Sequence, residues 1–237
     1  MDAPPFDPEL GAALAAYGEA AREPCTPENL ADRQARDAAA RPRPTVRDLE
    51  DANRLVIGGK SAGGGLAAAL ALLTRDRGGP VPIGQLLLSP MLDDRDHTFS
   101  SRQMAGVDTW DRTSNATAWQ ALLADRYGAE DLPPHAAPAR AKDLSRLPPA
   151  YIEVGSAETF RDEDVAYAQA IWRAGGRAEL HVWPGAFHGF DTVAPRAALS
   201  QRARDARTRW LRRLLTQLGT EPGTPSDAAP TAPFTRP

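Results

Sequence analysis

The chain has 237 residues, of which 42% are hydrophobic and 25% are charged, so it is long enough to bury the core of a globular domain. The 28 Lys and Arg residues and the 31 Asp and Glu residues give a formal net charge of −3, which argues against nucleic acid or an anionic membrane as a partner. The single cysteine, Cys25, excludes an internal disulfide and a cysteine-rich zinc site, and we expect no metal.

The N-terminal region is expected to contain two helices. Asp7 and Pro8 form an N-cap and a first-turn proline ahead of apolar residues at helical spacing, and Thr26 and Pro27 repeat this signal ahead of an Ala-rich run. We assign residues 1–45 to these helices and a Pro-rich linker. The segment has no pattern of a secretion signal, and no later window is apolar enough for a membrane span, so we expect a cytoplasmic protein.

The rest of the chain alternates short apolar runs with helical patterns. The apolar runs, each expected to be a strand, lie at residues 54–57, 83–89, 151–154 and 178–183. Helices are predicted around residues 66–73, 114–127, 162–174 and 199–218. Continuous apolar strands separated by helices predict an α/β fold with a mostly parallel sheet of about four strands, flanked by helices. We assign this core to residues 46–219 and predict a disordered Pro- and Thr-rich tail over residues 220–237.

The turn after the first strand carries the motif Gly59-Lys60-Ser61-Ala62-Gly63. A G-x-S-x-G sequence between a strand and a helix is typical of a nucleophile elbow, a sharp turn that lifts the serine hydroxyl off the sheet. We expect glycines at 59 and 63 because a side chain at either position would clash with the neighbouring strand or helix. The backbone N–H of Ala62, at the start of the helix, is expected to face a developing oxyanion.

Other interpretations of this glycine-rich turn are weaker. Gly-Lys-Ser also ends a phosphate-binding loop, but Arg54 stands where that motif needs its first glycine. Gly63-x-Gly65-x-x-Ala68 fits a dinucleotide fingerprint, but it lies within the helix and not in the turn. A glycine-rich turn with a chemically idle serine is the remaining alternative. We therefore expect no cofactor.

A serine nucleophile needs a base and a group that orients the base. Glu158 is the first carboxylate after the third strand, and His188 lies in the loop after the fourth. The order Ser61, Glu158, His188 is that of a hydrolase triad, and the carboxyl ends of parallel strands are where open α/β sheets bind ligands. These three residues are the predicted catalytic triad.

Four segments resemble the alpha/beta-hydrolase esterases of the hormone-sensitive-lipase-like branch. They are residues 58–73, 86–96, 147–168 and 183–191, and the resemblance extends over about residues 54–218. It implies a cap that starts with the N-terminal helices, and hydrolysis of a small, short-chain carboxylic ester. By this resemblance Ser61 is the nucleophile, His188 the general base and acid, and Glu158 the orienting carboxylate, at a position that is more often aspartate in the family.

The chain departs from this family in two ways. Lys60 stands where the branch usually has an acidic residue, which inverts the local charge at the elbow. The His-Gly-Gly-Gly loop that supplies further oxyanion N–H groups is absent, since no histidine in the sequence is followed by two glycines. The short stretch between Pro44 and Ser61 leaves no room for the strands that should precede the elbow. The sequence therefore resembles this esterase with an internal segment removed.

This truncation has two expected consequences. Each lost oxyanion donor lowers turnover by about 10²–10³-fold, so even an assembled triad would be weak. The first strand, without its neighbours, becomes an exposed apolar edge, which predicts self-association. The alternative to a weak esterase is a catalytically inactive remnant that acts as a binding or assembly module.

Other candidate residues are given structural roles. Asp93, Asp94 and Asp96 follow a strand and are expected to be a solvated acidic cluster, not a metal site. Trp172 and Trp210 keep helical spacing with apolar neighbours and are expected in the core.

Overall fold

The computed structural model describes residues 2–17, 23–32 and 54–220. Its strands form one parallel sheet in the order β1-β2-β3-β4. The strands are β1 (Val56–Lys60), β2 (Gly84–Leu88), β3 (Ala150–Gly155) and β4 (Ala178–Trp183). The α/β class and the parallel sheet predicted from the sequence are confirmed.

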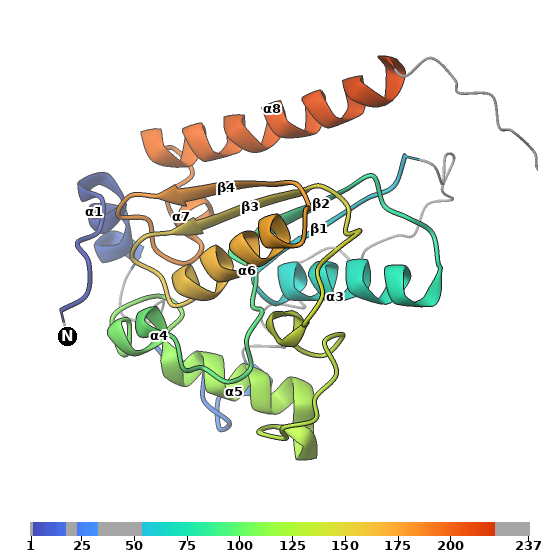
Figure 1. The fold of residues 1–237 in the computed structure, drawn as a ribbon. Helices are drawn as coiled ribbons and strands as arrows, with labels where there is room; N and C mark the ends of the chain where they lie inside the picture. The colour runs from blue at the N-terminus through green and yellow to red at the C-terminus, as the bar shows by residue number, and fades with distance from the viewer. Residues whose placement is uncertain (1, 18–22, 33–53, 221–237) are drawn as a thin grey trace, which may run out of the picture.

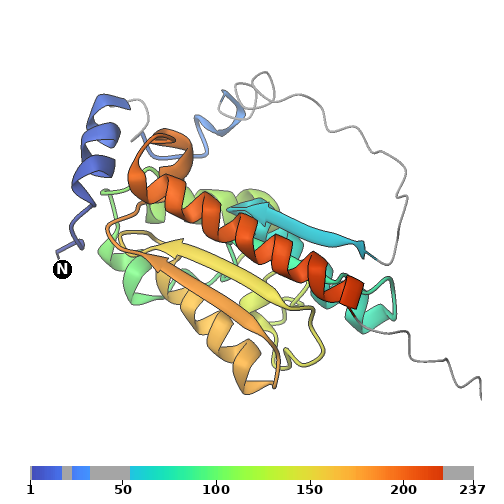
Figure 2. The ribbon, with the colours of Figure 1, turned by 90° about the horizontal axis from the view of Figure 1, so that it is seen from above.

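Helices cover both faces of this sheet (Figure 1). The long helix α8 lies on one face, and Figure 2 shows it lying along the sheet, roughly in line with the strands. Helices α3 and α6 lie on the other face, with α4 and α5 beyond them. The helices are α1 (Pro8–Tyr17), α3 (Ala62–Arg77), α4 (Phe99–Gln103), α5 (Arg112–Leu123), α6 (Arg161–Arg173), α7 (Phe190–Val193) and α8 (Ala198–Thr220), with short 3₁₀ turns η3 (Ala124–Arg126) and η4 (Pro138–Arg140).

The core has a layer on each face of the sheet. On one face, Leu87 and Ile152 pack with Leu72 of α3 and Ile171 of α6. On the other face, a second cluster contains Tyr151 of β3 with Trp210 and Leu214 of α8. A Cβ atom at Gly84 would lie 2.5 Å from Leu214 Cδ2, so glycine at this position lets α8 pack close to β2.

Strand β1 is an edge strand in the part of the chain that the structure describes. It pairs with β2 from Val56 opposite Gly84 to Lys60 opposite Leu88. In α3, the helix that follows β1, Leu66 is 59% exposed and Leu70 is 43% exposed. The expected edge is present among the described residues, and self-association through it stays a prediction.

Several expected boundaries shift in the structure. The first strand was expected at residues 54–57 but runs from Val56 to Lys60, because Gly58 and Gly59 continue the pairing with β2. The helix expected to reach residue 127 ends at Leu123 and gives way to η3. Trp210 is 5% exposed, as expected for a core residue. Trp172 is 45% exposed, so its assignment to the core was wrong.

The expectation of a solvated acidic cluster after β2 was also wrong. Asp93, Asp94 and Asp96 are buried, with exposed fractions of 4%, 3% and 5%. Burial of a carboxylate requires a compensating partner. Each of the three has an arginine, in the pairs Asp93–Arg95 at 2.7 Å, Asp94–Arg140 at 2.6 Å and Asp96–Arg112 at 3.0 Å.

The N-terminal predictions are only partly covered by the structure. Helix α1 lies beside α7, and the N–H of Asp7 donates to the carbonyl of Gly185 at 2.8 Å. Residues 27–29 form a turn and residues 30–32 are helical, while residues 33–40 of the second expected helix, the linker and residues 221–237 lie outside the described residues. The division near residue 45 therefore stays a prediction. Within the described residues, no helix has the length and apolar character that crossing a membrane requires.

Candidate active site

The turn between β1 and α3 has the strained geometry of a nucleophile elbow. Ser61 has φ 57° and ψ −126°, a positive φ that non-glycine residues seldom adopt. Its N–H donates to the Leu88 carbonyl at 2.9 Å, and its own carbonyl accepts the N–H of Met91 at 3.0 Å. These backbone hydrogen bonds to β2 and to the loop after it hold the turn in its strained conformation.

The glycines of the elbow are not equally required. A Cβ atom at Gly59 would lie 2.2 Å from the carbonyl oxygen of Gly63, so the expected steric reason holds there. A Cβ atom at Gly63 would meet nothing within 4 Å, so the expected clash at this position was wrong. The close approach occurs two residues later, where a Cβ atom at Gly65 would lie 2.1 Å from the Met91 carbonyl oxygen. The start of α3 therefore packs against the loop after β2 through Gly65 and not through Gly63.

The structure brings the three predicted triad residues together. His188 Nε2 lies 3.0 Å from Ser61 Oγ, and His188 Nδ1 lies 2.5 Å from Glu158 Oε1. The side chain of His188 is 11% exposed and that of Glu158 is fully buried. With the proton on Nδ1 donated to Glu158, Nε2 is free to accept the hydroxyl proton of Ser61. The arrangement can transfer a proton from a serine nucleophile to a histidine base.

Glu158 is fixed by further hydrogen bonds. Its Oε2 atom accepts the Gly155 N–H at 2.9 Å and the Ser89 hydroxyl at 3.0 Å. A Cβ atom at Gly155 would lie 2.0 Å from the Ala186 carbonyl, so the loop before His188 packs directly on the end of β3. Sequence reasoning missed Ser89, although its place directly after β2 was the available signal.

Two aromatic rings lie near the imidazole of His188. The ring of Phe160 meets it edge-to-face with centroids 5.2 Å apart, and the indole of Trp110 lies 6.1 Å away. Both contacts restrict the rotation of the imidazole, so its two nitrogens stay aimed at Ser61 and Glu158.

Lys60 does not leave an unbalanced positive charge at the elbow. Its Nζ atom lies 2.6 Å from Asp191 Oδ1 and 2.8 Å from Thr192 Oγ1. The other oxygen of Asp191 accepts a hydrogen bond from Arg207, which also pairs with the buried Glu153. Although burial opposes ionisation, the charges of Lys60 and Arg207 lower the pKa of Asp191 to about 2. The expected inversion of charge at the elbow is thus offset by Asp191.

Ala62 is the first residue of α3, directly after Ser61. The first N–H groups of a helix have no partner within the helix, so they are suited to an oxyanion. Within the described residues no group of three His, Cys, Asp or Glu side chains is arranged to hold a metal ion.

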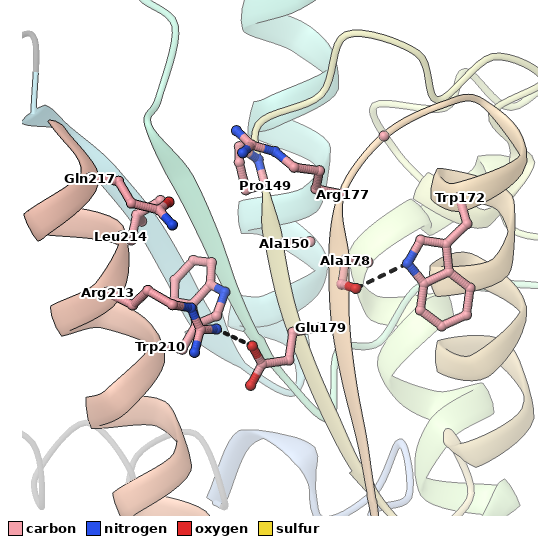
Figure 3. A pocket seen from close by; sticks show the side chains of 11 residues that line it. Pro149, Ala150, Trp172, Arg177, Ala178, Glu179, Trp210, Arg213, Leu214 and Gln217 are labelled. Atoms are coloured by element: carbon pink, nitrogen blue, oxygen red, sulfur yellow. Dashed lines mark hydrogen bonds and ion pairs between the residues drawn. The ribbon is translucent and has the colours of Figure 1, made fainter. Parts of the chain in front are cut away.

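A cavity of about 420 Å³ lies at the other end of the sheet (Figure 3). It is lined by Ala150 and Ala178 at the amino ends of β3 and β4, by Trp172, and by Trp210 and Arg213 of α8. The triad residues follow the carboxyl ends of their strands. This cavity is therefore separate from the candidate active site.

Comparison with known proteins gives the family. Residues 25–192 match the family model described as alpha/beta hydrolase fold. A solved esterase from the bacterial hormone-sensitive lipase family is 31% identical with a TM-score of 0.63, over 70% of this chain and 55% of that chain. The chain belongs to the hormone-sensitive-lipase-like branch of the alpha/beta hydrolases. The resemblance identified from the motifs is confirmed.

Other relatives of this alpha/beta hydrolase are named as esterases or as an acetyl-hydrolase. Carboxylesterase NlhH of Mycobacterium tuberculosis is 37% identical over 62% of this chain and 48% of its own length. An acetyl-hydrolase of Streptomyces hygroscopicus is 32% identical over 78% of this chain and 61% of its own length. The structure of a bacterial heroin esterase is 39% identical, with a TM-score of 0.67, over 70% of this chain and 53% of that chain. The chain thus spans about half the length of most of these relatives.

Proposed function

We propose that this alpha/beta hydrolase is a serine-dependent carboxylic ester hydrolase. The observation that carries the proposal is the hydrogen-bonded series Ser61–His188–Glu158, with distances of 3.0 Å and 2.5 Å, on a strained elbow. The names of the relatives, carboxylesterase and acetyl-hydrolase, support an ester as substrate. A short acyl chain is proposed from the family resemblance. The single cysteine, which cannot form an internal disulfide, supports a cytoplasmic location.

The proposed reaction has two steps. His188 Nε2 takes the proton from Ser61 Oγ as this oxygen attacks the ester carbonyl carbon, and the N–H of Ala62 stabilises the oxyanion. The imidazolium gives the proton to the leaving alkoxide, and an acyl-serine remains. Water then attacks the acyl group, His188 accepts its proton, and the carboxylic acid leaves as the proton returns to Ser61. Throughout, Glu158 orients His188 and stabilises its charged form.

A second candidate is an inactive remnant that acts as a binding or assembly module. The observations that favour it are the missing His-Gly-Gly-Gly sequence, the edge position of β1 among the described strands, and the partial coverage of the relatives. An inactive remnant and a weak esterase differ in turnover and not in fold.

Hydrolysis of a short-chain aryl ester separates these two candidates. We expect the chain to release the phenolate above background, Ser61→Ala to abolish the release, and Ser145→Ala to leave it unchanged. Ser145 is a suitable control because its hydroxyl bonds to Asp143, away from the triad. Circular dichroism shows whether each variant is folded. No turnover by a folded sample would favour the inactive module.

A further inference from the structure

The segment before α5 contacts the backbone of His188 on both sides. The His188 N–H donates to Asp108 Oδ2 at 3.1 Å, and the Thr109 hydroxyl donates to the His188 carbonyl at 2.6 Å. Asp108 is 3% exposed and lies 80 residues from His188 in the sequence. Two side chains from one segment therefore fix the peptide groups that carry the imidazole.

The same segment also reaches the helix start beside Glu158. The Thr159 hydroxyl donates to the Trp110 carbonyl at 2.7 Å, and the Trp110 indole lies 6.1 Å from the His188 ring. The segment Asp108–Trp110 thus connects the residue after the triad acid with the triad base. Nothing in the reaction as proposed above uses Asp108 or Thr109.

We propose that Asp108 and Thr109 are positioning residues that hold His188 in line with Ser61, and that the charge of Asp108 acts together with that of Glu158 on the imidazole. The expected effect of these two residues on turnover rests on the proposed function. The expected effect of Asp108 on His188 does not require turnover.

The charge on Asp108 is expected to change near neutral pH. Burial, together with the nearby charge of Glu158, raises the pKa of Asp108 to about 7, although His188 and the backbone N–H groups of His188 and Thr109 oppose the rise. Glu158 and His188 are the ionisable groups that act on it. When Asp108 ionises, its negative charge stabilises the imidazolium that forms during Ser61 attack. We therefore expect kcat to rise with pH through this range partly because of Asp108.

The first test measures the NMR chemical shifts of the His188 ring as a function of pH. Asp108→Asn keeps the size of the side chain and an oxygen acceptor for the His188 N–H, but removes the charge. The chain has only four histidines, so His188→Gln assigns the signal. We expect the pH response of the His188 ring signals to move to lower pH in Asp108→Asn, because the imidazolium loses a nearby negative charge. Asp125→Asn, which removes an exposed carboxylate on η3, is the matched control and should leave the curve unchanged.

The second test separates the effect of the Thr109 hydroxyl group from the effect of the size and shape of the side chain. Thr109→Val removes the hydrogen bond to the His188 carbonyl, and we expect kcat to fall about tenfold with little change in KM. Thr109→Ser restores the hydroxyl and should restore kcat.

The outcomes distinguish the inference from the proposed function. A wild-type chain without turnover whose His188 signals still shift in Asp108→Asn would contradict esterase activity and support the action of the Asp108 charge on His188. An active wild-type chain in which Asp108→Asn changes neither the titration of His188 nor the pH profile of kcat would overturn the role of Asp108. Equal kcat for Thr109→Val and the wild type would overturn the role of Thr109.

Discussion

At the scale of single residues, the glycines around Ser61 differ in the space that a side chain would find. The G-x-S-x-G pattern singled out Ser61 and Gly59, whose Cβ atom would clash, but the second close contact that needs glycine is at Gly65 and not at Gly63. Gly63 is an exposed residue in the first turn of α3. Its presence is therefore not explained by packing within the described structure.

Alanine substitutions test this difference. Gly63→Ala should leave the free energy of unfolding unchanged or raise it by about 0.5–1 kcal/mol, because alanine favours the helix. Gly65→Ala should lower it by about 1–3 kcal/mol, because the new methyl group overlaps the Met91 carbonyl. Urea unfolding of the two variants measures both. Equal destabilisation would show that Gly63 has a packing role that the structure does not contain.

At the scale of elements, a network of charges joins parts of the fold that are distant in sequence. Lys60 at the end of β1 pairs with Asp191 of α7, and Asp191 pairs with Arg207 of α8. Arg207 also pairs with Glu153 of β3. Since α7 begins two residues after His188, this network holds the loop that carries His188 against the strand that ends beside Ser61.

Acid should weaken this network. The pKa of Asp191 is about 2 in the folded chain and near 3.8 when unperturbed, so its stabilisation is complete above about pH 4 and is lost as the pH falls towards 2. We expect Asp191→Asn to lower the free energy of unfolding by about 2 kcal/mol at pH 7, and the difference from the wild type to shrink below pH 4.

Urea unfolding at pH 7 and at pH 2.5 measures this effect, with Asp205→Asn on the exposed side of α8 as control. The control should have the same free energy of unfolding as the wild type at both pH values. A difference between Asp191→Asn and the wild type that is independent of pH would contradict the electrostatic account.

The elements could be predicted, and the three candidate triad residues could be placed at one edge of the sheet, because both depend on local patterns. Ser61, Glu158 and His188 each follow an apolar run, and parallel strands bring their carboxyl ends to one edge of a sheet. Contacts between residues that are distant in the sequence have no such local pattern. Asp94 was expected in solvent because its partner, Arg140, lies 46 residues away, and Asp108 is 80 residues from the histidine that it holds.

Trp172 illustrates a further limit of periodicity. Its helical spacing indicated a buried face of α6, but the indole is 45% exposed and its N–H donates to the Ala178 carbonyl at 3.0 Å. Ala178 begins β4, which is the last strand of the described sheet. Spacing places a residue on a face of its helix, but it does not tell where the sheet under that face ends.

At the scale of the whole molecule, the described sheet stops at β1, the strand that directly precedes Ser61. An edge strand has unpaired backbone groups that can join another chain. The adjacent α3 exposes Leu66 and Leu70, which lie one turn apart and form an apolar stripe. Together these features favour association between copies of the chain.

Light scattering after size exclusion tests the association. We expect the wild-type mass to rise with concentration, and Leu66→Lys to lower this tendency because a charge disfavours burial of the stripe. Leu122→Lys changes a leucine of similar exposure, 52% on α5, and should behave as the wild type. A monodisperse monomer at every concentration would contradict the prediction.

The central claim is that Ser61 is an activated nucleophile, and labelling with a fluorophosphonate probe tests it most directly. We predict one adduct per chain, located by peptide mass mapping on the peptide that contains Ser61. The adduct should be absent in Ser61→Ala and should form more slowly in His188→Gln. A folded wild-type chain that carries no adduct at Ser61 would contradict the claim.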